Sequence, residues 1–330
     1  MNNITIAIPT YGRIDSLRRR VQELLPQMDG GDRLYIFDNA TEGFDPRLIP
    51  ELQDSRVVLT INHVNVGGNA NITKCISCVS SGWLWLLSDD DSVKDGAVKS
   101  IKEIVSTRSE CCFISFCPDS KGFVREKSLL ATGLAEFLQL NDGFQWTLLM
   151  SNCVFNLDKI ATYLKSSYTS IWMNCPHLAP VINCLQDGGR ALYSEKSLVV
   201  WRPPNLKKSW SIVPVYNLLQ LCSLVSDPAD AKSLRKVISK GLPSKFRFTL
   251  EVCASQARHG KDWRALPYAA TVLWGLSRDK GILNKLMFLC LFASLVFPRF
   301  SMMLFEILYF LAKRRRLGDT LQDRPFKLYL

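Results

Sequence analysis

The stretch GWLWLLSDDD, residues 82–91, decides the fold that this sequence predicts. Its first part, residues 82–87, is apolar at nearly every position, which is typical of a central parallel strand covered on both faces. Asp89, Asp90 and Asp91 follow this apolar run after a single serine. We therefore expect a buried strand inside a sheet, with three carboxylates at the point where the strand ends.

Further strands and helices alternate on both sides of this stretch. Apolar and β-branched runs predict strands, and apolar residues at helical spacing predict the helices between them. The predicted strands are residues 4–8, which Pro9 is expected to end, 34–37, 57–61 and 112–116. The predicted helices are residues 13–25, 69–79 and 95–105. This alternation predicts an α/β fold with an open, mostly parallel sheet and flanking helices.

Polar or glycine-rich loops follow the strands of the predicted sheet. They are residues 9–11, 38–39, 65–69 and 88–91. The carboxyl ends of parallel strands meet at one edge of a sheet, which is where open α/β folds bind ligands. We therefore expect these loops to line a single crevice.

The three adjacent aspartates require an explanation. Carboxylates this close together raise one another's pKa unless positive charge compensates them. Oxygen-only ligands suit Mg²⁺ or Mn²⁺, which typically binds one or two carboxylates together with substrate phosphates. Such an ion would neutralise the charge on a departing diphosphate. The alternative is a solvated acidic turn in which Asp91 or Ser92 caps the next helix.

Four motifs carry a resemblance to a known family. They are IAIPTYGR at residues 6–13, IFDNA at 36–40, NVGGNAN at 65–71 and LLSDDD at 86–91. In this order and spacing they resemble the family 2 glycosyltransferases, which have the GT-A fold. The resemblance implies a GT-A-like sheet, a nucleotide-sugar donor, and a divalent cation, Mg²⁺ or Mn²⁺, bound through a DXD motif.

The resemblance also implies roles for individual residues. Asp89 and Asp91 match the outer carboxylates of the DXD motif, with Asp89 on the ribose side of the donor. Asp91 would coordinate the metal on the diphosphate, and Asp89 is the second candidate metal ligand. Tyr11 would lie near the nucleobase and Asp38 would contact it. The whole nucleotide-sugar site would comprise Pro9, Tyr11, Arg13, Asp38, Asn65, Gly67, Asn71, Asp89 and Asp90.

The second half of the chain departs from the family where a catalytic base is expected. Many members have an acidic pair at the start of a downstream helix, which is here expected to open at residues 174–177 without any acidic residue. The late histidine that completes the metal site of some members is also missing from residues 199–202. Three residues are alternative bases, namely His177, Asp187 and Glu195. The competing interpretation is a structural role for His177 and a solvated helix end for Asp187.

Other segments resemble the acceptor side of these enzymes. Residues 151–155 resemble the acceptor-side strand, and Trp146 is a candidate for stacking on an acceptor sugar, with a place in the core as the alternative. PHLA at residues 176–179 and WRPPN at 201–205 resemble the subset that builds bacterial O-antigen units, including abequosyltransferase-like members.

The 330 residues are ordinary in composition but uneven in charge. A hydrophobic content of 47% and a charged content of 22% exclude a disordered or collagen-like chain. Residues 1–200 carry 19 Lys and Arg against 22 Asp and Glu, whereas residues 201–330 carry 22 against 8. We therefore expect residues 1–205 to form the nucleotide-sugar-binding and catalytic domain, and residues 206–330 to form a basic, mainly helical, membrane-associating region.

Two apolar segments near the C-terminus predict contact with a membrane. Residues 286–297 and 300–312 are each too short to span about 30 Å of hydrocarbon, and the basic cluster KRRR follows at 313–316. Two short apolar helices with a basic cluster favour an in-plane anchor on anionic lipid. A span or re-entrant segment within 286–312 and an ordinary core hairpin are the alternatives.

Cysteine usage and the first residues predict a reducing compartment. Eleven cysteines lie at irregular positions, and MNNITIAIPTYGR at the start lacks a secretory signal pattern. Cys75 and Cys78 have CxxC spacing without a second pair, which favours core or surface thiols over a zinc site.

Together these features predict a glycosyltransferase of bacterial O-antigen (lipopolysaccharide) or capsule biosynthesis. It would move a hexosyl or deoxyhexosyl unit from a nucleotide sugar to an oligosaccharide carried on a polyprenyl diphosphate. We expect a peripheral protein at the cytoplasmic face of the bacterial inner membrane. The alternatives are a catalytically inactive GT-A-like assembly partner and a nucleic-acid-binding protein, although no zinc finger, RNP motif or basic and aromatic stripe supports the latter.

Overall fold

The computed structural model describes most of the N-terminal part of the chain. The described residues are 3–119, 124–141, 143, 147–200 and 213–241, with isolated residues between 282 and 307. The chain divides into two compact units, the first comprising residues 1–204 and 220–238 and the second residues 205–219 and 239–330. The boundary expected at residue 205 stays a prediction. Trp146, WRPPN at 201–205 and the basic cluster at 313–316 lie outside the described residues.

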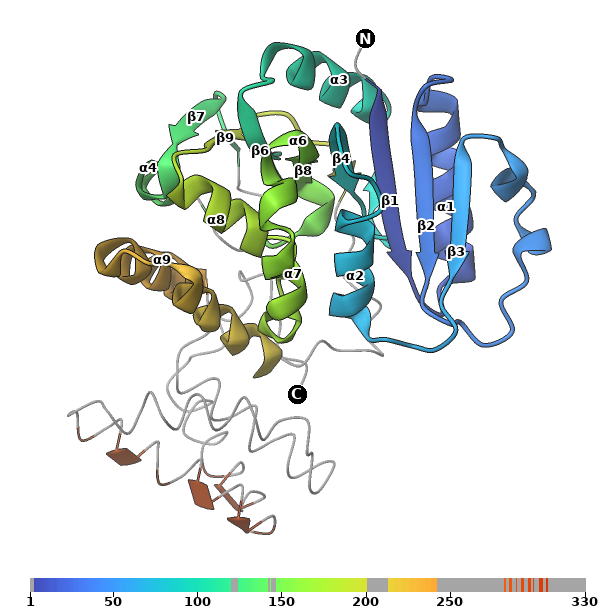
Figure 1. Ribbon diagram of the computed structural model, residues 1–330. Coiled ribbons are helices and arrows are strands. Elements are labelled where there is room, and N and C mark those ends of the chain that lie inside the picture. The colour runs from blue at the N-terminus through green and yellow to red at the C-terminus, as the bar shows by residue number, and fades with distance from the viewer. Residues whose placement is uncertain are drawn as a thin grey trace. The chain divides into compact units, whose positions relative to one another are not determined.

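A mixed eight-stranded sheet forms the centre of the first unit, in the order β3-β2-β1-β4-β8-β6-β9-β7 (Figure 1). The strands on one side are all parallel, and they are β1 (Ile4–Thr10), β2 (Arg33–Asp38), β3 (Val57–Ile61) and β4 (Trp83–Leu86). On the other side, β8 (Cys153–Asn156) runs antiparallel to both of its neighbours, β4 and β6 (Cys111–Ser115). Next in the sheet, β9 (Arg190–Tyr193) runs parallel to β6 and antiparallel to the edge strand β7 (Leu129–Thr132). The sheet is therefore open and mostly parallel, as the sequence predicts.

Helices cover both faces of this sheet (Figure 1). They are α1 (Ile14–Leu24), α2 (Gly68–Ile76), α3 (Ala97–Thr107), α4 (Gly133–Gln139), α6 (Leu157–Ile160), α7 (Lys165–Thr169) and α8 (Ala179–Gln186), and α9 (Pro228–Gly241) follows in the chain. The chain leaves β1 through α1 toward β2, and it returns from β3 through α2 to β4 on the other side of β1. Because such crossovers are right-handed, α1 and α2 lie on opposite faces.

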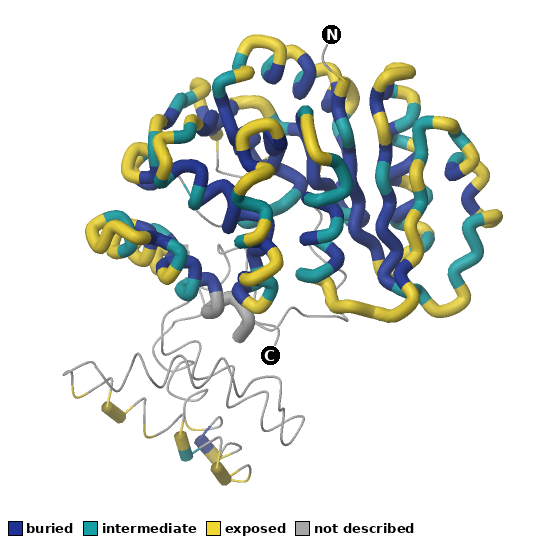
Figure 2. Tube along the Cα trace, in the orientation of Figure 1, coloured by how far each residue is buried: buried dark blue, intermediate teal, exposed yellow. Residues whose placement is uncertain are grey.

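The core is built from the apolar stripe of α1 and the buried strands. Leu17, Val21 and Leu24 recur at helical spacing and are buried in one cluster with Ile6 and Trp85 of the sheet. Each such side chain contributes about 1.5–3 kcal/mol when it is removed from water. Figure 2 shows β1 and β4 buried along most of their length. The stripe thus fixes α1 on the sheet, and Asp89 and Asp91 in the loop after β4 are themselves buried.

The strand predicted at residues 82–87 is β4, and it has the expected parallel neighbour on one side only. All residues of β4 are buried, and β4 pairs parallel with β1 but antiparallel with β8. The segment before β8 lies at the carboxyl edge of β4, where the N–H of Ser88 donates to Ser151 Oγ. Because β8 starts from that edge, it runs in the direction opposite to β4.

Pro9 lies inside β1 and does not end it. Leu87 N–H, just past the end of β4, donates to the carbonyl of Ala7. The backbone polar groups of residues two apart in a strand point to the same neighbouring strand, so the nitrogen of Pro9 points to the same side as the carbonyl of Ala7. On that side β4 has already ended, and no partner there requires the N–H that Pro9 lacks. The strand therefore continues to Thr10 without losing a ladder hydrogen bond.

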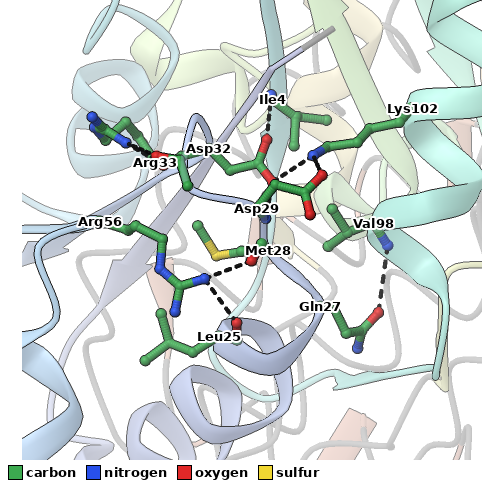
Figure 3. A network of polar contacts seen from close by, with 11 residues as sticks. Ile4, Leu25, Gln27, Met28, Asp29, Asp32, Arg33, Arg56, Val98 and Lys102 are labelled. Atoms are coloured by element: carbon green, nitrogen blue, oxygen red, sulfur yellow. Dashed lines mark hydrogen bonds and ion pairs between the residues drawn. The ribbon is translucent and has the colours of Figure 1, made fainter. Parts of the chain in front are cut away.

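An ionic cluster of two buried residues, Lys102 and Asp32, and the exposed Asp29 joins α3 to the amino-terminal edge of the sheet (Figure 3). Lys102 Nζ lies 2.7 Å from Asp29 Oδ2 and 2.7 Å from Asp32 Oδ2. The other oxygen of Asp32 accepts a hydrogen bond from the N–H of Ile4, the first residue of β1, at 2.9 Å. Because Lys102 and Asp32 are buried, the two charges compensate each other where water cannot.

The CxxC pair consists of free thiols in and after α2. Cys75 is fully buried, and burial raises the pKa of Cys78 to about 12. Both thiols are therefore protonated at neutral pH, which agrees with a packing role.

The described residues of the second unit include an exposed apolar series. These side chains recur every three or four residues, and they are Ile282, Leu286, Leu289, Phe292 and Val296. Within the part of the chain that the structure describes, no helix combines the length and hydropathy needed to cross a membrane.

Candidate active site

The site lies where the strand order of the sheet reverses. From β1 the chain builds toward β3, and it then returns to place β4 on the other side of β1. In open α/β sheets ligands bind outside the carboxyl ends of the strands at such a point. Here Thr10, the last residue of β1, donates from Oγ1 to Asp89 Oδ2 at 2.7 Å. This hydrogen bond joins the ends of the two strands and brings the aspartates to the reversal.

Arg13 compensates two of the three aspartates. Its Nη1 lies 2.8 Å from Asp89 Oδ1 and 2.8 Å from Asp90 Oδ2, and Asp90 also accepts a hydrogen bond from the hydroxyl of Ser88. Asp89 is only 2% exposed, and its burial raises the pKa of that carboxyl while the Arg13 charge opposes the rise. Arg13 precedes the first turn of α1, so the helix holds the guanidinium against the end of β4. The predicted residues Arg13, Asp89 and Asp90 therefore form one cluster.

Asp91 is buried without such compensation. It is 6% exposed, and burial raises the pKa of its carboxyl to about 6. Its Oδ2 accepts a hydrogen bond from Ser151 Oγ at 2.6 Å. Among the described residues, no ion pair to Asp91 is found, although the more distant charge of Arg20 lowers its pKa in part.

The donor set around Asp91 fits a hard divalent cation that is shared with a substrate. In the described part of the chain no group of three or more His, Cys, Asp and Glu side chains could hold a metal ion. Mg²⁺ usually takes only one or two protein carboxylates and completes its shell with water and substrate phosphates. Both oxygens of Asp89 already have partners in Thr10 and Arg13, so Asp91 is the better placed ligand of the two predicted ones.

Asp38 organises the loop after β2. Its two oxygens accept hydrogen bonds from Thr41, from Oγ1 at 2.5 Å and from the backbone N–H at 2.9 Å. Thr41 Oγ1 in turn accepts from the backbone N–H of Gly12 at 2.8 Å. Asp38 thus connects the loop after β2 to the loop after β1. Its predicted contact with a nucleobase stays a prediction.

A network of amides shapes the glycine loop that opens α2. Asn39 Oδ1 accepts from the N–H of Val66 at 2.9 Å, and Asn39 Nδ2 donates to Asn65 Oδ1 at 2.8 Å. Asn65 Oδ1 also accepts from the N–H of Gly67, whose φ of +87° favours glycine. These bonds hold the loop at the carboxyl edge of the sheet.

The same network continues into the core of α2. Asn62, directly after β3, donates from Nδ2 to the side-chain oxygens of Asn39 and Asn71, each at 3.0 Å. Asn71 Nδ2 donates to the carbonyl of Phe37 at 2.8 Å, and Lys74 Nζ donates to Asn62 Oδ1 at 2.7 Å. The predicted residues Asn65, Gly67 and Asn71 therefore act together through Asn39 and Asn62.

The remaining predicted nucleotide residues differ in exposure. Tyr11 is 53% exposed in the loop after β1, next to the Gly12 contact just described. Pro9 is buried inside β1, where it contributes to the sheet. Tyr11 is thus accessible to a ligand at this edge.

The three candidate bases lie at different places in the first unit. His177 is 3% exposed beside the ring of Phe155, and burial lowers its pKa to about 4. Asp187 follows α8 and accepts a hydrogen bond from the Tyr163 hydroxyl at 2.6 Å. Glu195 follows β9 and accepts from the Ser128 hydroxyl.

Topology separates these candidates. β9 runs in the direction of β4, so Glu195 lies at the carboxyl edge with the aspartates. Asp187 precedes β9 and lies at the opposite edge, about 12 Å along α8 from the His177 end of that helix. The geometry therefore gives Asp187 no support as a base, whereas His177 and Glu195 stay candidates.

The helix expected to open at residues 174–177 begins later, at Ala179. Asn174 has a φ of +64°, which ends the preceding turn, and Pro176 and His177 belong to the next one. Backbone in the left-handed region cannot continue into a helix, so the chain needs further residues before the first helical turn of α8.

The expected position of the late histidine lies beside the aspartates. Val200 of β10 (Val199–Val200) pairs with Ser92 of β5 (Ser92–Val93), directly after Asp91. An apolar side chain stands here where some family members have a metal ligand. Val200 therefore offers no further ligand to a cation at Asp91.

Sequence reasoning gave no individual role to Thr10, Asn62 or Ser151, although Thr10 lies in the predicted loop 9–11 and Ser151 in the segment 151–155. Thr10 and Asn62 each lie at the carboxyl end of a strand, where the residues that the sequence analysis did select also lie. Ser151 stands before an antiparallel strand, so no local signal connects it to this edge.

A mostly parallel sheet, with carboxylates at the carboxyl edge where its strand order reverses, is the arrangement of a GT-A-fold glycosyltransferase. Residues 5–172, just over half of the chain, match the family described as Glycosyl transferase family 2. The chain belongs to this family. No curated protein sequence matches it.

Two solved structures of low sequence identity are among those with a similar fold. TarS 1–349 from S. aureus in complex with UDP has a TM-score of 0.56 and 9% identity, covering 83% of this chain and 80% of that chain. The mannosyltransferase PcManGT from Pyrobaculum calidifontis, in complex with GDP-Man and Mn²⁺, has a TM-score of 0.53 and 11% identity, covering 89% and 87%. At these identities the likeness shows a shared fold.

Proposed function

We propose that this glycosyltransferase moves a hexosyl or deoxyhexosyl unit from a nucleotide sugar to a lipid-linked oligosaccharide in bacterial O-antigen or capsule biosynthesis. The single observation that carries the donor half of this proposal is the buried carboxylate of Asp91, to which no ion pair is found among the described residues. It stands beside Asp89 and Asp90, which Arg13 compensates, at the reversal of the strand order.

The chemistry requires one bond to break and one to form. The bond between the anomeric carbon and the diphosphate oxygen breaks, an acceptor hydroxyl forms the new glycosidic bond, and its proton passes to a base. A cation at Asp91, Mg²⁺ or Mn²⁺, would supply positive charge to the departing diphosphate. Arg13 and the loop of Asn65 and Gly67 would position the donor, and Glu195 or His177 would accept the proton.

The acceptor half of the proposal rests on the C-terminal part of the chain. Exposed apolar side chains at helical spacing precede the cluster KRRR at 313–316, and the last 130 residues carry most of the excess positive charge. Such a combination suits an anionic membrane surface, where a sugar carried on a polyprenyl diphosphate is held. The proposed location is the cytoplasmic face of the inner membrane, and the abequosyltransferase-like subset is the finer placement.

A donor screen tests the proposal directly. Thermal unfolding of the purified protein would be followed with nucleoside diphosphates and nucleotide sugars carrying uracil, guanine, cytosine or deoxythymine, with Mg²⁺, with Mn²⁺ and without added metal. A bound donor raises the unfolding temperature by mass action. We expect at least one donor to do so, and to do so more strongly with Mn²⁺. A chain that no donor stabilises with either Mg²⁺ or Mn²⁺ would contradict the proposal.

One observation favours a second function, that of a catalytically inactive assembly partner. His177 is buried, and residues 174–177 contain no carboxylate that could serve as a base. An inactive partner would keep its effect on polysaccharide assembly when Asp91 is replaced by Ala at normal protein levels. Loss of the polysaccharide in that strain would instead support the enzyme.

A further inference from the structure

Ser151 connects both ends of the stretch that carries the aspartates. It lies in η4 (Met150–Asn152), a single 3₁₀ turn before β8, and is 1% exposed. Its carbonyl accepts a hydrogen bond from Trp85 Nε1 at 2.9 Å. Its hydroxyl oxygen accepts from the N–H of Ser88 at 2.9 Å and donates to Asp91 Oδ2 at 2.6 Å. One buried side chain thus contacts the stretch at two points and its backbone contacts it at a third.

These contacts determine the direction of the hydroxyl proton. A serine hydroxyl has one proton to donate and lone pairs that accept. Because the N–H of Ser88 occupies one lone pair, the proton is directed to the carboxylate of Asp91. A hydrogen bond to an ionised carboxylate is stronger than a neutral one, so it holds the Asp91 side chain in one orientation.

The same bond leaves the two oxygens of Asp91 unequal. Oδ2 is engaged by Ser151, while in the described part of the chain no hydrogen bond reaches Oδ1. A carboxylate that binds a cation through one oxygen is commonly held through the other, and such outer contacts set metal affinity. At Asp91, Oδ2 is the oxygen held by Ser151, and Oδ1 is the oxygen that could bind a cation.

We propose that Ser151 is a positioning residue, which holds Asp91 through Oδ2 so that Oδ1 stays available to the divalent cation of the donor complex. This inference rests on the proposed function, because it requires Asp91 to bind that cation. Ser151 touches neither donor nor acceptor in this role and acts only through Asp91.

The structure provides a way to separate this role from a general effect on folding. Ser151→Ala removes the hydroxyl but keeps the carbonyl that accepts from Trp85. Ser170→Ala is the matched control, because Ser170 is also buried and, among the described residues, its hydroxyl bonds only the backbone carbonyl of Ser166 in α7. Ser151→Cys keeps nearly the same volume with a weak donor, and it decides the matter if Ser151→Ala does not fold.

The experiment measures Mn²⁺ binding from the loss of the free Mn²⁺ signal in electron paramagnetic resonance, with UDP, GDP, CDP or dTDP present in turn, after subtracting the loss that each nucleotide causes without protein. We expect Ser151→Ala and Ser151→Cys to weaken Mn²⁺ binding by roughly 10- to 100-fold, the usual effect of losing an outer contact to a metal ligand. Ser170→Ala should bind Mn²⁺ like the wild type.

The outcomes are distinguishable. Wild-type affinity in both Ser151 variants would overturn this inference and leave the proposed function intact. Equal losses in Ser151→Ala and Ser170→Ala would also overturn it, because they would indicate a general structural effect. A wild-type protein that binds no Mn²⁺ with any of the four nucleotides would contradict the proposed function, and this inference with it.

Discussion

Asp89 and Asp91 are two residues apart and both buried, yet the protein compensates their charges differently. Asp89 has a guanidinium at 2.8 Å, whereas Asp91 has the hydroxyl of Ser151. Burial raises the pKa of both carboxyls, and the pKa of Asp91 reaches about 6. A buried carboxylate without a counter-charge is unfavourable unless a cation arrives. At the scale of single residues, this difference is the strongest sign of a cation site.

Replacing Asp91 by Asn tests this difference. The variant keeps the shape of the side chain and removes its charge, so we expect metal-dependent sugar transfer to fall by about 10²- to 10³-fold, which is typical for the loss of one electrostatic contact to a reacting group. Steady-state rates over a range of Mn²⁺ concentrations measure it. The control is Asp95→Asn, because Asp95 is exposed and lies four residues further on. Equal activity in the two variants would argue against a role for Asp91.

His177 makes stability depend on pH. Burial lowers its pKa to about 4, below the ordinary value of 6.5 that it regains in the unfolded chain. Between these values the unfolded state binds the proton and the native state does not, so stability is fully present above pH 6.5 and is lost as the pH falls toward 4. The loss is on the order of 3 kcal/mol.

Urea unfolding between pH 7 and pH 4.5 checks this expectation. His177→Gln should lose less stability over that interval than the wild type, while His63→Gln should behave like the wild type because His63 is exposed. Identical pH dependence in all three proteins would refute the assignment.

At the scale of elements, buried polar contacts fix where helices and loops meet the sheet. Figure 3 shows Lys102 of α3 pointing at Asp29 and Asp32, beside the first residue of β1. Removing one partner of a buried pair leaves an uncompensated charge. At the carboxyl edge of the sheet, the amide network of Asn39, Asn62 and Asn71 likewise holds the glycine loop in place.

Lys102→Met should therefore destabilise the protein by about 3–5 kcal/mol, because Asp32 stays buried without its counter-charge. The free energy of unfolding from urea titration at pH 7 measures this. Lys99→Met is the matched control on the same helix, because Lys99 is exposed. A loss no larger than that of the control would show that the ionic cluster contributes little.

Element boundaries in the parallel half of the sheet follow closely from the sequence. The strand at 57–61 is reproduced residue for residue, and β1, β2 and β4 differ from their predicted ranges by at most two residues at either end. These elements are specified by local apolar patterns, which a sequence displays directly. The antiparallel insertion of β8 and the start of α8 are specified by contacts with distant segments, and no local pattern reports them.

At the scale of the whole molecule, the acidic N-terminal part and the basic C-terminal part suit two different ligands. In the proposed function the aspartates of the first unit would face a soluble donor, and the last 130 residues carry the charge that would attract anionic lipid. Membrane binding of this kind stays a proposal, which the next experiment addresses.

Replacing the basic cluster at 313–316 by glutamines should weaken binding to phosphatidylglycerol vesicles. Each Lys or Arg near an anionic surface contributes about 1 kcal/mol, so four replacements should lower the affinity by roughly 10³-fold. Co-sedimentation at low salt measures it. The control variant replaces an equal number of exposed basic residues of the first unit, namely Lys99, Lys159, Lys165 and Arg190. Equal binding by both variants would contradict a role for the cluster, and retention in carbonate-washed membranes would favour a span.

The sequence by itself determined the class of fold, the edge of the sheet that bears the site and the family, because apolar runs and the residues after them are local features. Only the tertiary structure decided how the carboxylates are used. Arg13 and Asp89 are 76 positions apart and Ser151 and Asp91 are 60 apart, and the order of the strands alone brings each pair into contact. Burial, which separates Asp91 from a solvated acidic turn, likewise depends on what packs around it and cannot be read from neighbouring residues.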